Sequence, residues 1–305
     1  MKGESLAQTD AAQRVSYALQ PWVTLLRPVH WLKNLLLIVP LIFAHATISI
    51  DLCVHMALGL VAMSLAASAG YIVNDVKDAA FDRLNRHKRQ RPIAQGLITP
   101  GSALVVALGL LAASLAISAL LLGATVTWMI LAYIGATTAY SSYLRRVAVA
   151  DILALAALYI WRLLIGGEIS ETPLSAWLIC FAASLFVALA LMKRLDELHS
   201  LQLSSMGRGY QGAHWPALLT LTILFAAAAL LVCASYVAFS EAASHHYRNP
   251  AWLWLATLSF LLWLVHLLRR STAGRAEGDP VLFAASNPAS LALIAAGAVA
   301  YFAAI

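Results

Sequence analysis

Three carboxylates in one short stretch have a spacing that suits metal chemistry. Asp75, Asp78 and Asp82 stand at i, i+3 and i+7 in NDVKDAAFDR, and Asn74 precedes Asp78 by four residues. On a helix these spacings put all four side chains on one face, where the like charges repel unless a cation lies among them. Mg²⁺ suits such a face because it takes oxygen ligands and often bridges one or two carboxylates to substrate phosphates. We therefore predict Asn74, Asp75, Asp78 and Asp82 as Mg²⁺ ligands, with the aspartates catalytic. The alternative is a solvated face on which they pair with basic residues of the same loop.

Basic residues follow these carboxylates in RLNRHKRQRPIAQG. Arg83, Lys88 and Arg91 could turn back over the metal and bind phosphate oxygens, arginine through its planar fork and lysine as a point charge. Pro92 fixes a turn directly after Arg91. The neighbouring Arg89 is better explained by the general excess of cations in cytoplasmic loops of membrane proteins.

The elements that must position these residues are apolar helices. Hydrophobic residues make up 62% of the 305-residue chain, charged residues only 11%, and the mean hydropathy is +0.80. Since about 20 apolar residues cross a bilayer as a helix, we predict an all-α polytopic membrane protein. The nine predicted spans cover residues 33–50, 53–76, 102–122, 124–143, 147–166, 174–195, 215–239, 250–268 and 286–304.

The distribution of cations predicts the orientation of these nine spans. With the N-terminus in the cytoplasm and the C-terminus outside, all but two of the 20 Lys and Arg residues fall on the cytoplasmic side or in the adjoining helix ends. The exceptions are Arg162, which lies within a span, and Arg248. The net charge of +6 is thus explained by membrane topology, and we predict no nucleic-acid partner. We further expect a cytoplasmic tail over residues 1–26 and one transmembrane domain over residues 27–305.

Three further groups of charged residues lie on the same predicted cytoplasmic face. Arg27 and Lys33 flank the start of the first span, where they bind substrate or anchor the helix at the membrane surface. An arginine inside a span is costly, so Arg162 either serves function or forms a buried pair with Asp151. The predicted substrate-binding set is Lys33, Arg83, Lys88, Arg91, Tyr140, Arg145, Asp151, Arg162, Lys193, Arg194 and Glu197. Glu197 also stands four residues after Lys193, the spacing of a local ion pair.

Other residue types suggest packing rather than chemistry. The three cysteines stand alone within apolar runs, without the spacing of a metal site or a disulfide framework. Gly166 and Gly167 end a predicted span, and we expect a turn there rather than a phosphate-binding loop.

The motif NDVKDAAFDR, the basic return RPIAQG and the nine predicted helices together resemble the UbiA superfamily of intramembrane prenyltransferases. The resemblance extends from about Arg27 onward. It implies nine transmembrane helices around a central cavity, with Mg²⁺ and a diphosphate held by two Asp-rich motifs at the cytoplasmic face. The first motif matches at Asn74, Asp75, Asp78 and Asp82. At the second, Asp151 is followed by Leu155 where a second carboxylate is usual.

A narrower resemblance is to the decaprenyl-phosphate phosphoribosyltransferase branch, through RPVHWLKN, YIWRLLIGG, KRLDEL and GDPVLFA. It implies a bacterial plasma-membrane enzyme of cell wall biosynthesis. That enzyme would transfer 5-phosphoribosyl from 5-phosphoribosyl-1-diphosphate (PRPP) to a polyprenyl phosphate and release Mg²⁺-bound diphosphate. The lipid phosphate is already an anion and needs no general base, but it needs cations to approach PRPP.

Two other functions stay open from the sequence. A prenyltransferase of the same superfamily would instead take a prenyl diphosphate and an aromatic or other acceptor. A transporter without chemistry would place ionisable residues near the bilayer midplane on broken helices, whereas the charges here gather at one boundary.

Overall fold

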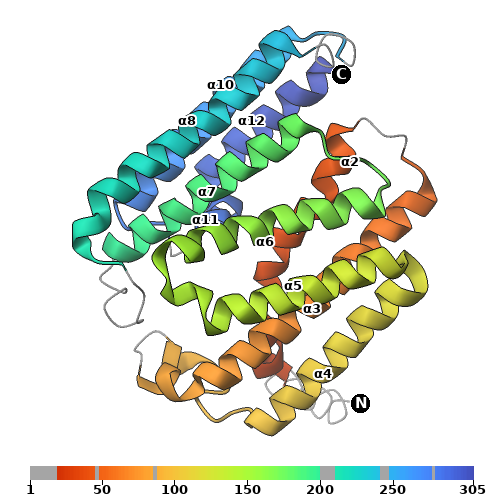
Figure 1. Ribbon diagram of the computed structural model, residues 1–305, viewed down its shortest axis with the longest axis vertical. Coiled ribbons are helices and arrows are strands. Elements are labelled where there is room, and N and C mark those ends of the chain that lie inside the picture. The colour runs from red at the N-terminus through yellow and green to blue at the C-terminus, as the bar shows by residue number, and fades with distance from the viewer. Residues whose placement is uncertain (1–18, 45–47, 85–87, 200–209, 241–246, 277–278) are drawn as a thin grey trace, which may run out of the picture. The chain divides into compact units, whose positions relative to one another are not determined.

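The computed structural model describes residues 19–44, 48–84, 88–199, 210–240, 247–276 and 279–305, and these are helical with no strand among them (Figure 1). The first 18 residues of the predicted N-terminal tail lie outside the described part of the chain. Two compact units follow from the packing: unit 1 comprises residues 1–35 and 50–138, and unit 2 comprises residues 36–49 and 139–305.

Unit 1 is built around the long helix α3 (Ile50–Leu84), which packs along α4 (Pro100–Ile117) (Figure 1). Thr99 starts α4 as its N-cap, since its hydroxyl accepts the Ser102 N–H, and Pro100 fills the first helical position. A π-helical turn (Ser118–Leu122) ends at Gly123, whose φ of 94° lets the chain turn into α5 (Ala124–Ser142). Alanines dominate the α3–α4 core, which lets the two helices approach closely.

Helix α3 is longer than the span of residues 53–76 that the sequence predicted. Its 35 residues correspond to about 52 Å, whereas a bilayer core is about 30 Å thick. The helix continues through the predicted acidic motif to Leu84, so Asp75, Asp78 and Asp82 do share one helical element. The helical spacing that the sequence predicted for these three aspartates is therefore present in α3.

The first predicted span, residues 33–50, is wrong in its bounds. Residues 19–26 are already helical, Arg27 breaks the helix with a φ of 53°, and a 3₁₀ helix, η1, covers Pro28–Ile38. A short helix α2 (Val39–Phe43) follows η1, and α3 begins at Ile50. The start of this segment was missed because it is flanked by polar residues, while its apolar face is stabilised by packing: Leu25 is almost fully buried in the unit 1 core.

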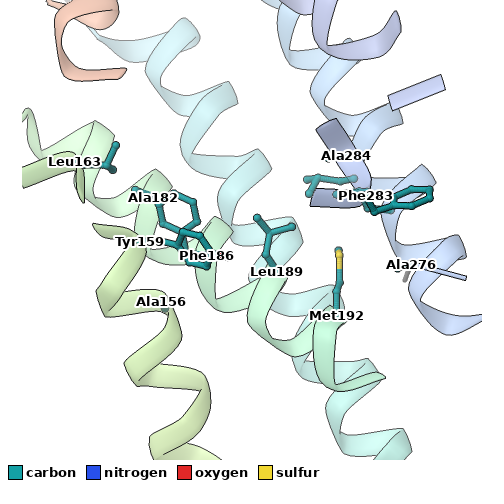
Figure 2. Packing of buried hydrophobic residues seen from close by; sticks show 12 residues of the cluster. Ala156, Tyr159, Leu163, Ala182, Phe186, Leu189, Met192, Ala276, Phe283 and Ala284 are labelled. Carbon is teal, nitrogen blue, oxygen red and sulfur yellow. The ribbon is translucent and has the colours of Figure 1, made fainter. Parts of the chain in front are cut away.

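Unit 2 contains α2, the last residues of α5, and the helices α6 (Ala148–Ile169), α7 (Ala176–His199), α8 (Trp215–Phe239), α10 (Ala251–Thr272), α11 (Pro280–Ser286) and α12 (Pro288–Ala304). Helix α7 packs against α6, α8 and α10, and α10 also packs against α12. Figure 2 shows the core, in which Tyr159 of α6 stacks on Phe186 of α7, and Leu189 and Met192 continue the cluster toward Phe283 of α11. This core fixes the C-terminal residues of α7, where several predicted site residues lie.

The last predicted span, residues 286–304, corresponds closely to α12, and the short helix α11 precedes it. α11 and α12 meet at an angle of 83°, at Asn287 and Pro288. Pro288 cannot donate a backbone hydrogen bond, and the Asn287 side chain caps α12 by accepting the Ser290 N–H. The break is therefore specified locally by an Asn-Pro pair.

Gly166 and Gly167 do not form the predicted turn, since both lie inside α6. A Cβ at Gly166 would lie 2.0 Å from the Leu37 carbonyl oxygen, and one at Gly167 would lie 2.3 Å from a Leu174 methyl carbon. The glycines are needed because other chain segments approach the helix closely, which the local sequence does not reveal.

The described residues include seven helices that are long and apolar enough to cross a membrane, or eight if the bent α11–α12 pair is one span. The prediction of an all-α polytopic membrane protein is confirmed. Nine spans and the orientation of the termini stay predictions.

Candidate functional site

The predicted acidic motif forms an ion-pair network in unit 1, which we call the Asp75 cluster: Arg27, Asn74, Asp75, Asp78, Asp82 and Arg91. One Arg91 nitrogen, Nη1, lies 3.0 Å from Asp75 Oδ1 and 2.7 Å from Asp82 Oδ2, so it bridges the two carboxylates. Both aspartates are buried, with 2% and 3% of their surface exposed. Buried carboxylates require such partners, because an unpaired charge away from water is costly.

Arg27 is the second cation of the cluster, and it was not in the predicted substrate-binding set. Its Nη2 donates to both oxygens of Asp75, at 2.7 and 2.9 Å, and its guanidinium lies 5.4 Å from the centre of the Tyr71 ring. Its backbone φ of 53° is unusual for a residue with a Cβ. The only sequence signal was a cation at the start of a membrane segment, and this has a simpler explanation in membrane anchoring.

Unit 1 also contains the other residues that the sequence predicted for this site. Asn74 donates to Asp78 across one helical turn, at 3.3 Å, and both side chains are partly exposed. Arg83 is exposed and its Nε donates to the Ala94 carbonyl at 3.2 Å, which ties the end of α3 to the return segment. Lys33 in η1 and Lys88 in η2 (Lys88–Gln90) are half-buried.

The oxygen donors of the Asp75 cluster suit a Mg²⁺ ion that arrives with a phosphate. Within the described ranges, no three acidic, histidine or cysteine side chains are gathered as a complete metal site. Mg²⁺ usually takes one or two protein carboxylates and completes its shell with water and substrate phosphate. The carboxylates of Asp75 and Asp82, with Asp78 one turn away, therefore fit the ion once Arg91 has moved off their oxygens.

A second network lies in unit 2, and we call it the Arg194 cluster: Tyr140, Asp151, Arg194, Glu197 and Tyr210. Arg194 binds Asp151 through two parallel contacts, Nε to Oδ2 at 2.5 Å and Nη2 to Oδ1 at 2.8 Å. Its third nitrogen, Nη1, binds Glu197. Tyr140 donates to Asp151 Oδ1 at 2.9 Å. The side chains of Arg194 and Asp151 have no exposed surface, so this network is enclosed in protein.

Tyr210 completes the Arg194 cluster and was not predicted. Its hydroxyl contacts the Ala148 carbonyl and lies 3.4 Å from Asp151 Oδ2. Burial raises the pKa of this hydroxyl, and the negative charge of Asp151 raises it further. The tyrosine thus stays neutral and holds the start of α6 against the segment before α8. No local sequence pattern could have indicated this contact, because Tyr210 is 59 residues from Asp151.

Charged residues at the end of α7 have partners beyond the predicted local pattern. Lys193 Nζ lies 3.7 Å from Asp279 Oδ2, and Asp279 also caps α11 by accepting the Val281 N–H. Asp196 accepts the Ala276 N–H at 2.8 Å and is buried. Glu197 pairs with Arg194 at i+3. The KRLDEL motif therefore ties α7 to the segment that leads into α11.

Arg162 lies buried in α6, apart from the ion pair in which the sequence placed it as one alternative. Its Nη1 donates to the Leu158 carbonyl at 2.7 Å, and its guanidinium lies 5.6 Å from the centre of the Tyr159 ring. Asp151 is instead bound by Arg194 of α7. Arg145 lies in the 3₁₀ turn Leu144–Arg146 and is half-buried.

Comparisons with known proteins agree on one family. The sequence profile described as the UbiA prenyltransferase family matches residues 34–287. An uncharacterized protein of Sinorhizobium fredii is 32% identical over 279 residues, which cover 90% of this chain and 54% of that protein. The nodulation protein NoeC of Azorhizobium caulinodans is 28% identical over 275 residues, 88% of each chain.

A third relative carries the name of a specific enzyme. Decaprenyl-phosphate phosphoribosyltransferase of Mycobacterium tuberculosis is 36% identical over 183 residues, which cover 58% of this chain and 60% of that enzyme. The matches thus span little more than half the length of both the Sinorhizobium and the mycobacterial proteins.

The fold has a solved counterpart. The structure of a UbiA homolog from Archaeoglobus fulgidus bound to GPP and Mg²⁺ superposes with a TM-score of 0.68 at 17% identity, covering 92% of this chain and 99% of that one. The helical architecture, the family profile and the motif at Asn74–Asp82 lead to the same result. This chain belongs to the UbiA prenyltransferase family.

Proposed function

We propose that this protein transfers the 5-phosphoribosyl group of PRPP to a polyprenyl phosphate in the membrane. An oxygen of the lipid phosphate forms a bond to ribose C1 while the bond from C1 to the diphosphate breaks, and the diphosphate leaves. A bound Mg²⁺ would supply charge neutralisation for the leaving diphosphate. Asp75, Asp78 and Asp82, with Asn74, would hold it.

The observation that carries this proposal is the state of Asp151. Resemblance to the superfamily implies a second acidic motif at this place, but Leu155 stands where its second carboxylate would be. The remaining carboxylate is enclosed, and both of its oxygens are bound by Arg194 and tyrosine hydroxyls. An aspartate that is enclosed in protein and paired with a fully buried arginine is a poor ligand for a second metal. This supports a donor other than an ordinary prenyl diphosphate, and the name of the mycobacterial relative supports PRPP.

The basic residues would have two kinds of role. In unit 1, Arg91, Arg83, Lys88 and Lys33 are proposed to bind diphosphate oxygens, since they are cations of the unit that contains the motif proposed to hold the metal. In unit 2, Lys193 and Arg145 are only partly buried and are proposed to bind a substrate phosphate. We instead propose positioning roles for Arg194, Asp151 and Glu197, because these side chains form ion pairs with one another. Tyr140 is proposed to have both roles, because it binds Asp151 while its side chain is only half-buried.

The test is an incubation of the purified full chain with radiolabelled PRPP, Mg²⁺ and decaprenyl phosphate, followed by organic extraction. We expect a labelled, lipid-soluble product that requires both Mg²⁺ and the polyprenyl phosphate. Absence of any labelled lipid, from protein that binds Mg²⁺ and diphosphate normally, would refute the sugar donor.

Prenyl transfer is the second candidate, because the Archaeoglobus homolog was solved with GPP. In that case the same purified protein would consume geranyl or longer prenyl diphosphates with an aromatic acceptor, and would leave PRPP untouched. Running both donors side by side on one preparation separates the two reactions.

A further inference from the structure

We propose that Arg27 and Arg91 act as placeholder cations on Asp75 and Asp82, and that they transfer to the diphosphate when a divalent metal takes the carboxylates. The metal and the diphosphate then bind together, and neither binds well alone. This inference rests on the part of the proposed function that puts a diphosphate at the Asp75 cluster. It does not depend on what the diphosphate carries.

Three carboxylate oxygens of Asp75 and Asp82 already accept hydrogen bonds from arginine side chains. Asp75 Oδ1 accepts from both arginines, at 2.7 and 3.0 Å, and Asp75 Oδ2 accepts from Arg27 at 2.9 Å. Asp82 Oδ2 accepts from Arg91 at 2.7 Å. A metal needs these same oxygens at shorter distances, so a guanidinium must leave before they can ligate.

The charges of these arginines also affect how a metal can bind. A divalent cation arriving alone would meet two guanidinium charges at the oxygens it requires, and the burial of both acids weakens screening by water. Release of both guanidiniums into water would break their ion pairs with Asp75 and Asp82 and would give them no new anionic partner. A diphosphate changes this balance, because its oxygens offer the guanidinium forks a second anion of matching geometry.

The two arginine side chains reach solvent from non-helical backbone, whereas the two acids are buried on a helix. Asp75 and Asp82 are fixed on the continuous helix α3. Arg91 follows the short η2 turn, and Arg27 stands at the break between two helical segments. Their side chains keep 23% and 22% of their surface exposed, whereas the aspartate side chains keep 3% and 4%. Exposed ends on non-helical backbone allow a change of partner without moving α3.

The backbone of Arg27 is consistent with this role. Its φ of 53° lies in the left-handed region, which costs energy for a residue other than glycine. Packing of Leu25 on one side and the hydrogen bond from Trp31 to Ser68 on the other, at 2.9 Å, hold this conformation. The strained turn aims the arginine at Asp75, so the buried carboxylate has a cationic partner.

The experiment is equilibrium dialysis of the purified full chain in lipid nanodiscs, with radiolabelled Mn²⁺ and radiolabelled inorganic pyrophosphate, counted separately. Wild-type protein should retain both labels in equal amounts when both are present, at concentrations where it retains neither ligand alone. Arg91→Gln and Arg27→Gln should each bind Mn²⁺ alone about tenfold more tightly, the scale of effects around a metal's ligands, and bind the Mn²⁺–pyrophosphate complex more weakly.

Arg89→Gln is the matched control, since it removes the same charge from an exposed residue of η2 that does not belong to the Asp75 cluster. It should behave as wild type in both measurements. Arg91→Lys serves if a glutamine variant does not fold, because it keeps the charge and should still exclude Mn²⁺ alone. The inference is overturned if wild-type protein binds Mn²⁺ equally well with and without pyrophosphate, or if both glutamine variants lose affinity for Mn²⁺ alone. Because neither label is a sugar, failure of PRPP transfer alone would leave this result intact.

Discussion

The Asp75 cluster and the Arg194 cluster contain the same chemical groups, aspartate and arginine, in opposite states of enclosure. In the Asp75 cluster the acids are buried while both arginines reach solvent. In the Arg194 cluster the arginine itself has no exposed surface and binds two acids through all three nitrogens. The first arrangement permits exchange of the cation, and the second does not. Identical residue types can thus form a binding site or a structural joint, depending on which partner water can reach.

In the Asp75 cluster, the greatest loss of activity is expected from a change at Asp78, whose side chain is only half-buried. Asp78→Ala should lower transferase activity by about 10³-fold, the loss seen when a group that stabilises developing charge is removed. The protein should remain folded, because Asp78 is only half-buried. Activity is measured by the lipid-extraction assay, and folding by thermal melting in detergent.

Asp51→Ala is the matched control for that variant. It removes the same residue type from the opposite end of the same helix, where the carboxylate is 84% exposed. Wild-type turnover is expected. Wild-type turnover in Asp78→Ala as well would remove this residue from the metal site.

The enclosed cluster should respond in stability. Arg194→Met leaves Asp151 and Glu197 buried without their cation, and should destabilise the fold by about 3–5 kcal/mol. Adding Asp151→Leu should recover part of this loss, because a well-packed apolar pair tolerates burial. Arg146→Met, at an exposed arginine of the neighbouring turn, should leave the melting temperature unchanged. A melting temperature of Arg194→Met equal to wild type would contradict the assignment of Arg194 as a structural joint.

At Tyr210, in the enclosed cluster, we expect the smallest change in stability. Tyr210→Phe removes one hydrogen-bonding hydroxyl and should cost about 1 kcal/mol at neutral pH. Because the folded-state pKa of Tyr210 lies above its ordinary value of 10.0, the hydroxyl ionises first in the unfolded chain. Its contribution is therefore complete below pH 10.0 and is lost as the pH rises through the folded-state value.

Unfolding in urea at a series of alkaline pH values checks this sign. The stability difference between wild type and Tyr210→Phe should shrink as the pH rises above about 10. A difference that grows instead would mean that the folded environment favours the tyrosinate.

The sequence predicted the parts of this molecule that depend on local periodicity. Long apolar runs indicated membrane helices, and the i, i+3, i+7 spacing placed Asp75, Asp78 and Asp82 on one face of α3. The ionic partners were less predictable, because they come from distant segments: Arg27 stands 48 residues before Asp75, and Arg194 stands 43 residues after Asp151. Local spacing instead suggested Arg162 as the partner of Asp151.

Close backbone approaches were also hidden from the sequence. Gly166 and Gly167 look like a turn in isolation, and only the packing of residue 37 and Leu174 against α6 explains them. The break at Asn287–Pro288 lies next to the predicted start of the last span, residue 286, whereas the short helix α11 before it was not predicted.

The length of α3 has a consequence for the membrane that surrounds it. The helix is one unbroken rod from Ile50 to Leu84, and its apolar stretch and its acidic end cannot shift relative to each other. Lipids that alter bilayer thickness would tilt or displace the whole rod, because a helix adjusts to hydrophobic mismatch as a unit. The depth at which Asp75 and Asp82 meet their ligands is therefore set jointly by the protein and by the lipid composition of its host membrane.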